Sequence, residues 1–83
     1  MLGSFENALS YVKKGGGISR KGWNGKGLSV RLQHPDESSK MTLPYLYLEY
    51  PGGIRVPWLA SQTDLLSDDW VWAAAPDTEE ESI

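Results

Sequence analysis

The sequence contains no cysteine and only one histidine, His34. Disulfide bonds are therefore excluded, and so are zinc sites built on cysteine or on paired histidine ligands. The chain is also short, because its 83 residues fall below the roughly 100 to 200 residues usual for one domain. A single core of this size stabilises a fold by only about a few kcal/mol, so we expect self-association to supplement it.

Long apolar runs are absent as well. The longest covers six residues, Trp70 to Ala75, whereas a membrane-spanning helix needs about 20. We therefore expect no membrane association. The N-terminal residues show no basic segment leading into an apolar stretch, so no secretory signal is expected and the cytoplasm is the default location.

Acidic residues are scarce in the body of the chain. The net charge is −3, yet four of the eleven acidic residues lie within the last seven positions, and residues 1–76 carry a net charge of +1. We predict one domain over residues 1–76 and a disordered acidic tail over 77–83. No acid occurs between Asn7 and Pro35, which predicts either a positive binding surface or a solubilising face. The basic residues of that stretch are Lys13, Lys14, Arg20, Lys21, Lys26 and Arg31.

One helix is predicted over residues 5–14. Ser4 is a favourable N-cap, and Gly15 provides a C-terminal stop. The apolar residues of this segment recur at helical spacing and form one stripe that must pack on a partner layer. They are Phe5, Ala8, Leu9 and Val12.

Most of the remaining chain has the pattern of β-structure. Extended segments are predicted at residues 18–21, 28–32, 45–50, 54–58 and 70–74, with a glycine turn at 51–53 that makes a hairpin. The expected core face of that hairpin comprises Leu46, Leu48, Ile54 and Val56. Ser61 and Asp64 resemble a capping box that begins a short helix ending at Leu66. The predicted fold class is α+β, with one N-terminal helix packed on a small, mainly antiparallel sheet and a short helical turn before the last strand.

Groups suited to catalysis are few. Ser61, His34 and Asp64 could be drawn as a triad, but Ser61 has no G-x-S-x-G motif and is better explained as a cap. Asp64, Asp68 and Asp69 do not have the spacing of an EF-hand or another recognised metal loop. We therefore expect a protein that is not an enzyme and has no metal or cofactor.

Residues 20–27 (RKGWNGKG) carry the clearest binding chemistry. They do not form a Walker loop, because Arg20 stands where its first glycine belongs and strand pattern follows in place of a helix. Arg20, Lys21 and Lys26 surround Trp23 and Asn24, and such a set can neutralise phosphates, stack a base and contact its edge. The alternative is that Trp23 covers a small core.

Polymeric nucleic acid is a less suitable ligand. An isoelectric point near 4.9 and a body charge of +1 are weak for a polyanion but sufficient for a ligand with two phosphates. A small nucleotide is therefore the preferred ligand class. A module for single-stranded nucleic acid or for another nucleotide stays as the alternative.

Two long motifs resemble a known family. Residues 20–27 and residues 56–70 (VPWLASQTDLLSDDW) are similar to the phage Thoeris anti-defence Tad2-like proteins. Residues 5–9 (FENAL) and 39–45 (SKMTLPY) also fit, so the resemblance extends over about residues 4–74. It implies an anti-defence role in the cytoplasm of an infected bacterium.

The resemblance also implies a mechanism. Members of that family act as sponges that sequester cyclic nucleotide immune signals without cleaving them. The usual ligand is a glycocyclic ADP-ribose isomer made by a TIR-domain enzyme, and some members hold cyclic oligonucleotides. Members form homo-oligomers with ligand pockets at subunit interfaces, which implies a dimer or tetramer here.

On this interpretation, the binding residues divide by the part of the ligand that they contact. Base stacking is expected from Trp23 and base-edge contacts from Asn24. Phosphate neutralisation is expected from Arg20, Lys21 or Lys26, and contacts to ribose hydroxyls from Thr63 or Asp64.

Overall fold

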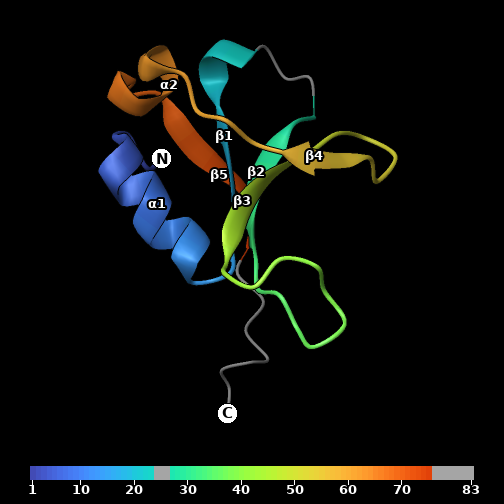
Figure 1. Ribbon diagram of the computed structural model, residues 1–83. Helices are drawn as coiled ribbons and strands as arrows, with labels where there is room; N and C mark the ends of the chain where they lie inside the picture. The colour runs from blue at the N-terminus through green and yellow to red at the C-terminus, as the bar shows by residue number, and fades with distance from the viewer. Residues whose placement is uncertain (24–26, 76–83) are drawn as a thin grey trace.

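The computed structural model describes residues 1–23 and 27–75, so the predicted acidic tail lies outside the described residues. The described part contains an N-terminal helix, a five-stranded sheet and a second, short helix before the last strand (Figure 1). The elements are α1 (Phe5–Lys13), β1 (Gly17–Arg20), the 3₁₀ turn η1 (Lys21–Trp23), β2 (Ser29–Gln33), β3 (Tyr45–Glu49), β4 (Arg55–Pro57), α2 (Gln62–Leu66) and β5 (Trp70–Ala74). The α+β prediction is confirmed.

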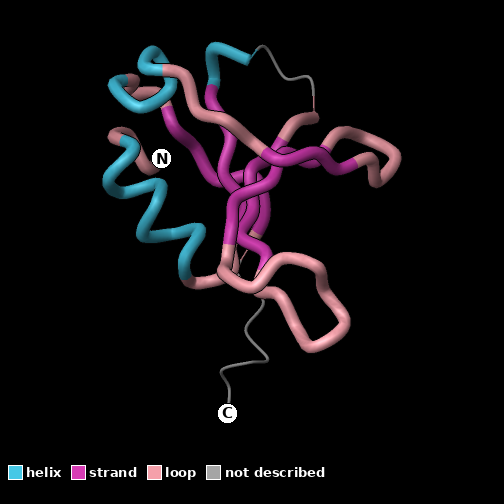
Figure 2. The backbone as a smooth tube through the Cα atoms, viewed as in Figure 1, coloured by secondary structure: helices cyan, strands magenta, loops and turns pink. Residues whose placement is uncertain are grey.

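The sheet has the strand order β4-β3-β2-β1-β5, and each neighbouring pair is antiparallel. The last strand therefore pairs with the first, although Arg20 and its ladder partner Trp70 are 50 positions apart in the chain. Figure 2 shows the strands as one curved layer, with both helices on the same side of it. The opposite face of the sheet carries no described helix.

Helix α1 begins and ends as its sequence predicts. The Ser4 hydroxyl accepts a hydrogen bond from the Asn7 N–H at 3.3 Å, and Gly15 has the left-handed φ of 101° that favours glycine after a helix. Ala8 and Val12 on its inner face are fully buried. They pack with Ile18, Val30 and Trp70 to form the core, and burial of each larger side chain stabilises the fold by about 1.5 to 3 kcal/mol.

Trp70 is the centre of an aromatic cluster that joins several elements. Its ring centroid lies 5.3 Å from that of Phe5 in α1, 5.5 Å from that of Trp23 in η1 and 6.0 Å from that of Trp58. Its indole Nε1 donates a hydrogen bond to the Asp64 carbonyl oxygen at 3.0 Å. Both helices and the η1 turn are therefore fixed to one buried side chain.

The predicted core face of the hairpin is only half right. Leu46 and Leu48 in β3 pack against the core, but Ile54 is 62% exposed and Val56 is 38% exposed. Strand β4 lies at the edge of the sheet, whereas α1 packs mainly over β1, β2 and β5. The alternation of apolar residues identified a shared face correctly, but little covers that face at β4.

Candidate functional site

The η1 turn follows directly from the end of β1 and is held by one residue near the start of β5. The Lys21 N–H donates to the Asp69 carbonyl oxygen at 3.1 Å, and the Gly22 N–H donates to Asp69 Oδ2 at 2.9 Å. Asp69 therefore binds the turn with both its backbone and its carboxylate.

Arg20 lies beside this turn and pairs with two carboxylates. Its Nε is 2.8 Å from Asp69 Oδ1, its Nη1 is 2.9 Å from Asp64 Oδ1, and its Nη2 is 3.4 Å from Asp69 Oδ2. The hydrogen bond to Asp69 is the main reason that the pKa of Arg20 is raised, and the same bond is the main reason that the pKa of Asp69 is lowered. All three groups therefore carry charge at neutral pH.

Asp64 has a second task at the start of α2. The Ser61 N–H donates to Asp64 Oδ2 at 3.2 Å, and the Asp64 N–H donates to the Ser61 hydroxyl oxygen at 3.0 Å. This confirms the predicted capping box. Burial by itself would raise the pKa of Asp64, but hydrogen bonds from Ser61 and Arg20 outweigh burial and lower the pKa.

Trp23 is half-buried, which leaves open both roles that the sequence offered, base stacking and cover for a small core. Its ring meets that of Trp70 at an angle of 78°, an edge-on arrangement favourable for aromatic pairs. Trp23 therefore contributes to the packing of the core margin and still keeps part of its surface open to solvent.

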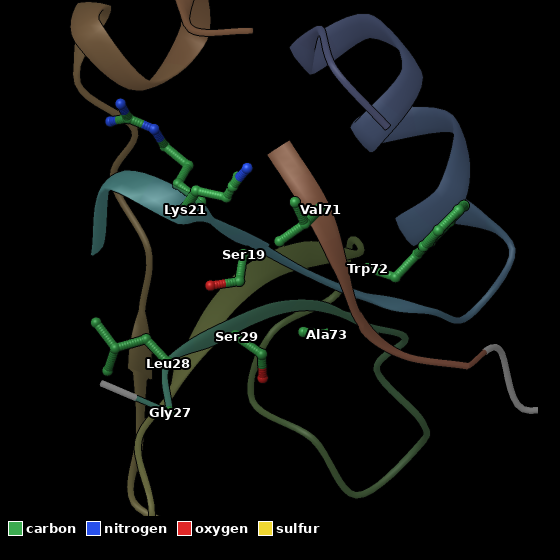
Figure 3. Close-up of a pocket in the computed structure, with 9 residues that line it drawn as sticks. Ser19, Lys21, Gly27, Leu28, Ser29, Val71, Trp72 and Ala73 are labelled. Carbon is green, nitrogen blue, oxygen red and sulfur yellow. The ribbon is translucent and has the colours of Figure 1, made fainter. Parts of the chain in front are cut away.

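A groove of about 590 Å³ lies beside the turn, on the face of the sheet away from α1. Ile18 and Val30 point toward the core, so the alternating residues Ser19 and Ser29 point to the other face. Figure 3 shows Ser19, Ser29, Leu28 and Val71 around this space. Arg20, Lys21, Gly27, Trp72 and Ala73 complete the lining.

Trp72 contributes to this lining without presenting its ring to the groove. Figure 3 shows the Trp72 side chain directed toward α1 and away from the labelled serines. Its ring packs on Tyr11 near the end of α1, with the centroids 6.4 Å apart. Trp23 in the adjoining turn is not among the residues that line the groove, because its ring packs on Trp70 at the margin of the core.

The structure places the predicted site residues in different surroundings. Lys21 is exposed and lines the groove, and Arg20 lines it while paired with Asp64 and Asp69. Thr63 is exposed in α2 and is not among the residues that line the groove. The predicted contacts from Asn24 and Lys26 lie outside the described residues.

Sequence reasoning missed three residues of this region. Ser19 and Ser29 could have been found, because each alternates with a buried neighbour on its strand. Asp69 carried no comparable signal, since its partner Arg20 is 49 residues away in the chain.

The described residues also limit other site types. Over residues 1–23 and 27–75, no three His, Asp or Glu side chains gather into a group that could hold a metal ion. None of the helices in that part of the chain is long and apolar enough to span a membrane. Within the described part of the chain, the polar groups that line the groove include the Lys21 ammonium group and the Ser19 and Ser29 hydroxyls.

Comparison with known proteins finds the same family over nearly all of this fold. The family model of the Thoeris anti-defense 2-like domain matches residues 3–73. The curated protein Thoeris anti-defense 2 of Bacillus phage SP01 is 34% identical over 80 residues, which covers 81% of this chain and 90% of that protein. The residues matched by the family model include η1, the ion pairs of Arg20 and all the residues that line the groove.

Proposed function

The chain belongs to the Thoeris anti-defense 2-like family and has a phage anti-defence role, and from this premise we propose that it binds and sequesters a cyclic nucleotide immune signal. The proposed ligand is of the glycocyclic ADP-ribose type, with cyclic oligonucleotides as further candidates. Binding lowers the free concentration of the signal inside the infected bacterium, so its effector is not activated. Affinity and copy number suffice for this function, without turnover or a cofactor.

The groove beside η1 carries the proposal. Its volume of about 590 Å³ falls within the range of roughly 300 to 1,000 Å³ typical of small-molecule sites. One wall offers the Ser19 and Ser29 hydroxyls, which suit ribose or phosphate oxygens, and the rim offers the Lys21 ammonium group. A nucleotide has phosphate and ribose oxygens that suit these donors, and it has a flat base that can stack on a tryptophan.

Among the proposed contacts, Lys21 lines the groove, whereas those of Trp23, Asn24, Lys26 and Thr63 rest on the family resemblance. Trp23 stacks a base, and Lys21 neutralises a phosphate together with Lys26. Asn24 contacts a base edge, and Thr63 contacts a ribose hydroxyl from α2. Arg20 and Asp64 are already bonded to each other, so we assign neither of them a direct ligand contact.

A second protomer is part of the proposal. Well-formed sites bury about 70 to 90% of a small ligand, whereas this groove lies on the face of the sheet that no described helix covers. A homodimer or homotetramer would bring a second surface over the ligand and would also supplement the small core.

Calorimetric titration with a glycocyclic ADP-ribose isomer tests the function. Lys21→Ala should weaken binding by about five- to thirtyfold, which corresponds to the roughly 1 to 2 kcal/mol expected for a charge-assisted contact. The matched control is Lys40→Ala, since Lys40 is exposed in the loop between β2 and β3, at the end of the sheet away from η1. Absence of binding by the unaltered protein, or equal loss in both variants, would contradict the proposal. Salt-sensitive binding to a single-stranded oligonucleotide instead would favour the alternative function.

A further inference from the structure

Arg20 and Asp69 form an ion pair beside the η1 turn. The sequence had suggested instead that Arg20 neutralises a phosphate of the ligand. We propose that Arg20 and Asp69 are positioning residues that hold η1, and with it Trp23 and Lys21, in the geometry that binds ligand. The consequence for ligand binding rests on the proposed function, whereas the consequence for the turn does not.

One carboxylate joins the end of β1 to the turn. Asp69 Oδ1 accepts from Arg20 Nε at 2.8 Å, while Asp69 Oδ2 accepts from the Gly22 N–H at 2.9 Å. The guanidinium group fixes the plane of the carboxylate, because Nη2 also approaches Oδ2 at 3.4 Å. The orientation of the Gly22 amide is therefore set by a side chain that Arg20 orients.

Gly22 permits this close approach because it has no side chain. A Cβ at this position would lie 3.0 Å from Asp69 Oδ2 and 3.3 Å from Arg20 Nη2. At these distances, either the turn or the Asp69 and Arg20 side chains would have to shift by a few tenths of an ångström to admit a larger residue. Glycine lets the turn and the ion pair meet without that shift.

The contacts close into a ring that includes Trp23. Arg20 Nη1 binds Asp64, and the Asp64 carbonyl oxygen accepts from the Trp70 indole N–H. The Trp70 ring packs on that of Trp23, which follows Gly22 in the turn and so returns to Asp69. Release of the turn from Asp69 would therefore change how Trp23 lies on Trp70.

The charge of the cluster argues against direct phosphate binding by Arg20. One guanidinium group is paired with the carboxylates of Asp64 and Asp69, so the three side chains together carry a net charge of −1. A phosphate would be attracted to the exposed ammonium group of Lys21 more strongly than to this cluster. Arg20 then affects binding through the turn that it helps to hold.

Asp69→Asn tests the inference, because it keeps the size of the side chain and removes its charge. We expect the ¹H–¹⁵N signals of the Gly22 amide and the Trp23 indole to shift, and the affinity for a glycocyclic ADP-ribose isomer to fall about tenfold. Asp68→Asn is the matched charge control, since Asp68 is exposed and neighbours Asp69, and it should change neither. Ser4→Ala is the stability control, because it removes the N-cap of α1, and it should lower the melting temperature and leave the affinity unchanged.

The outcomes separate the two proposals. Unchanged Gly22 and Trp23 signals in Asp69→Asn would overturn the positioning role, even if affinity fell, because Asp69 would then contact the ligand itself. A loss of affinity in Ser4→Ala equal to that in Asp69→Asn would also overturn it, since stability alone would explain both. If the unaltered protein binds no ligand, the proposed function fails, whereas shifted Gly22 and Trp23 signals in Asp69→Asn would still support the positioning of η1 by Arg20 and Asp69. If Asp69→Asn does not fold, Arg20→Lys is judged by the same criteria, because lysine keeps the charge and loses the fork of donors.

Discussion

Replacement of Trp70 by phenylalanine measures how much the buried indole contributes to the fold. Trp70 is fully buried, and its Nε1 donates to the Asp64 carbonyl oxygen at 3.0 Å. Trp70→Phe removes that hydrogen bond, which costs about 0.5 to 1.5 kcal/mol and leaves a partly buried acceptor. It also leaves a cavity of about 40 Å³, which adds roughly 1 kcal/mol. The expected loss is therefore about 1.5 to 2.5 kcal/mol in the free energy of unfolding.

The assay is thermal unfolding followed by circular dichroism. A domain of this size loses about 4 to 8 °C per kcal/mol, so the melting temperature should fall by roughly 6 to 20 °C. Trp72→Phe is the matched control on the same strand, because Trp72 is 57% exposed and packs only on Tyr11 among the described aromatic rings. It should change the free energy of unfolding by about 0.5 kcal/mol or less. Equal losses in the two variants would refute the assignment of Trp70 as the centre of the core.

Three further predictions concern the site, its charges and its assembly. Trp23→Ala should stay folded and lose roughly 1 to 3 kcal/mol of ligand affinity, measured by calorimetry, and unchanged affinity in a folded variant would reject base stacking. Asp64 and Asp69 have pKa values lowered below the ordinary 3.8 by their hydrogen bonds, so they stabilise the folded state fully above about pH 5 and progressively less as the pH falls through the folded pKa values. Melting temperatures should therefore fall below about pH 4 and fall less steeply in Asp69→Asn, and equal slopes would contradict the ion pairs. Light scattering at micromolar concentration should give twice or four times the 9.2 kDa of one chain, and a monomer would remove the second protomer from the proposed site.

The fold could be predicted to a large extent because its signals are local. Ser4 and Gly15 mark the ends of α1, and Ser61 and Asp64, three positions apart, mark the start of α2 through a capping box. The prediction that Ile54 and Val56 belong to the core was wrong, because alternation shows which residues share a face of a strand and does not show what covers that face. Whether other elements cover this face of β4 depends on the position of β4 in the sheet, which is a property of the whole fold.

The candidate site was harder to predict because its central interactions are not local. From the segment 20–27, which the sequence singled out for its basic and aromatic composition, Arg20, Lys21 and Gly27 line the groove and Trp23 does not. The pairing of Arg20 with Asp69 joins positions 49 residues apart, and the antiparallel contact of β1 with β5 creates it. A sequence shows that Arg20 is charged, but it does not show which carboxylate neutralises that charge.

Recovery of the bound molecule tests sequestration most directly. The protein is incubated with a glycocyclic ADP-ribose isomer, separated from the solution and denatured, and the released molecule is identified and quantified by mass spectrometry. The account predicts that the signal disappears from solution and returns unaltered on denaturation, in a fixed ratio to the protein. An altered molecule would indicate catalysis, and a signal that stays in solution would contradict binding.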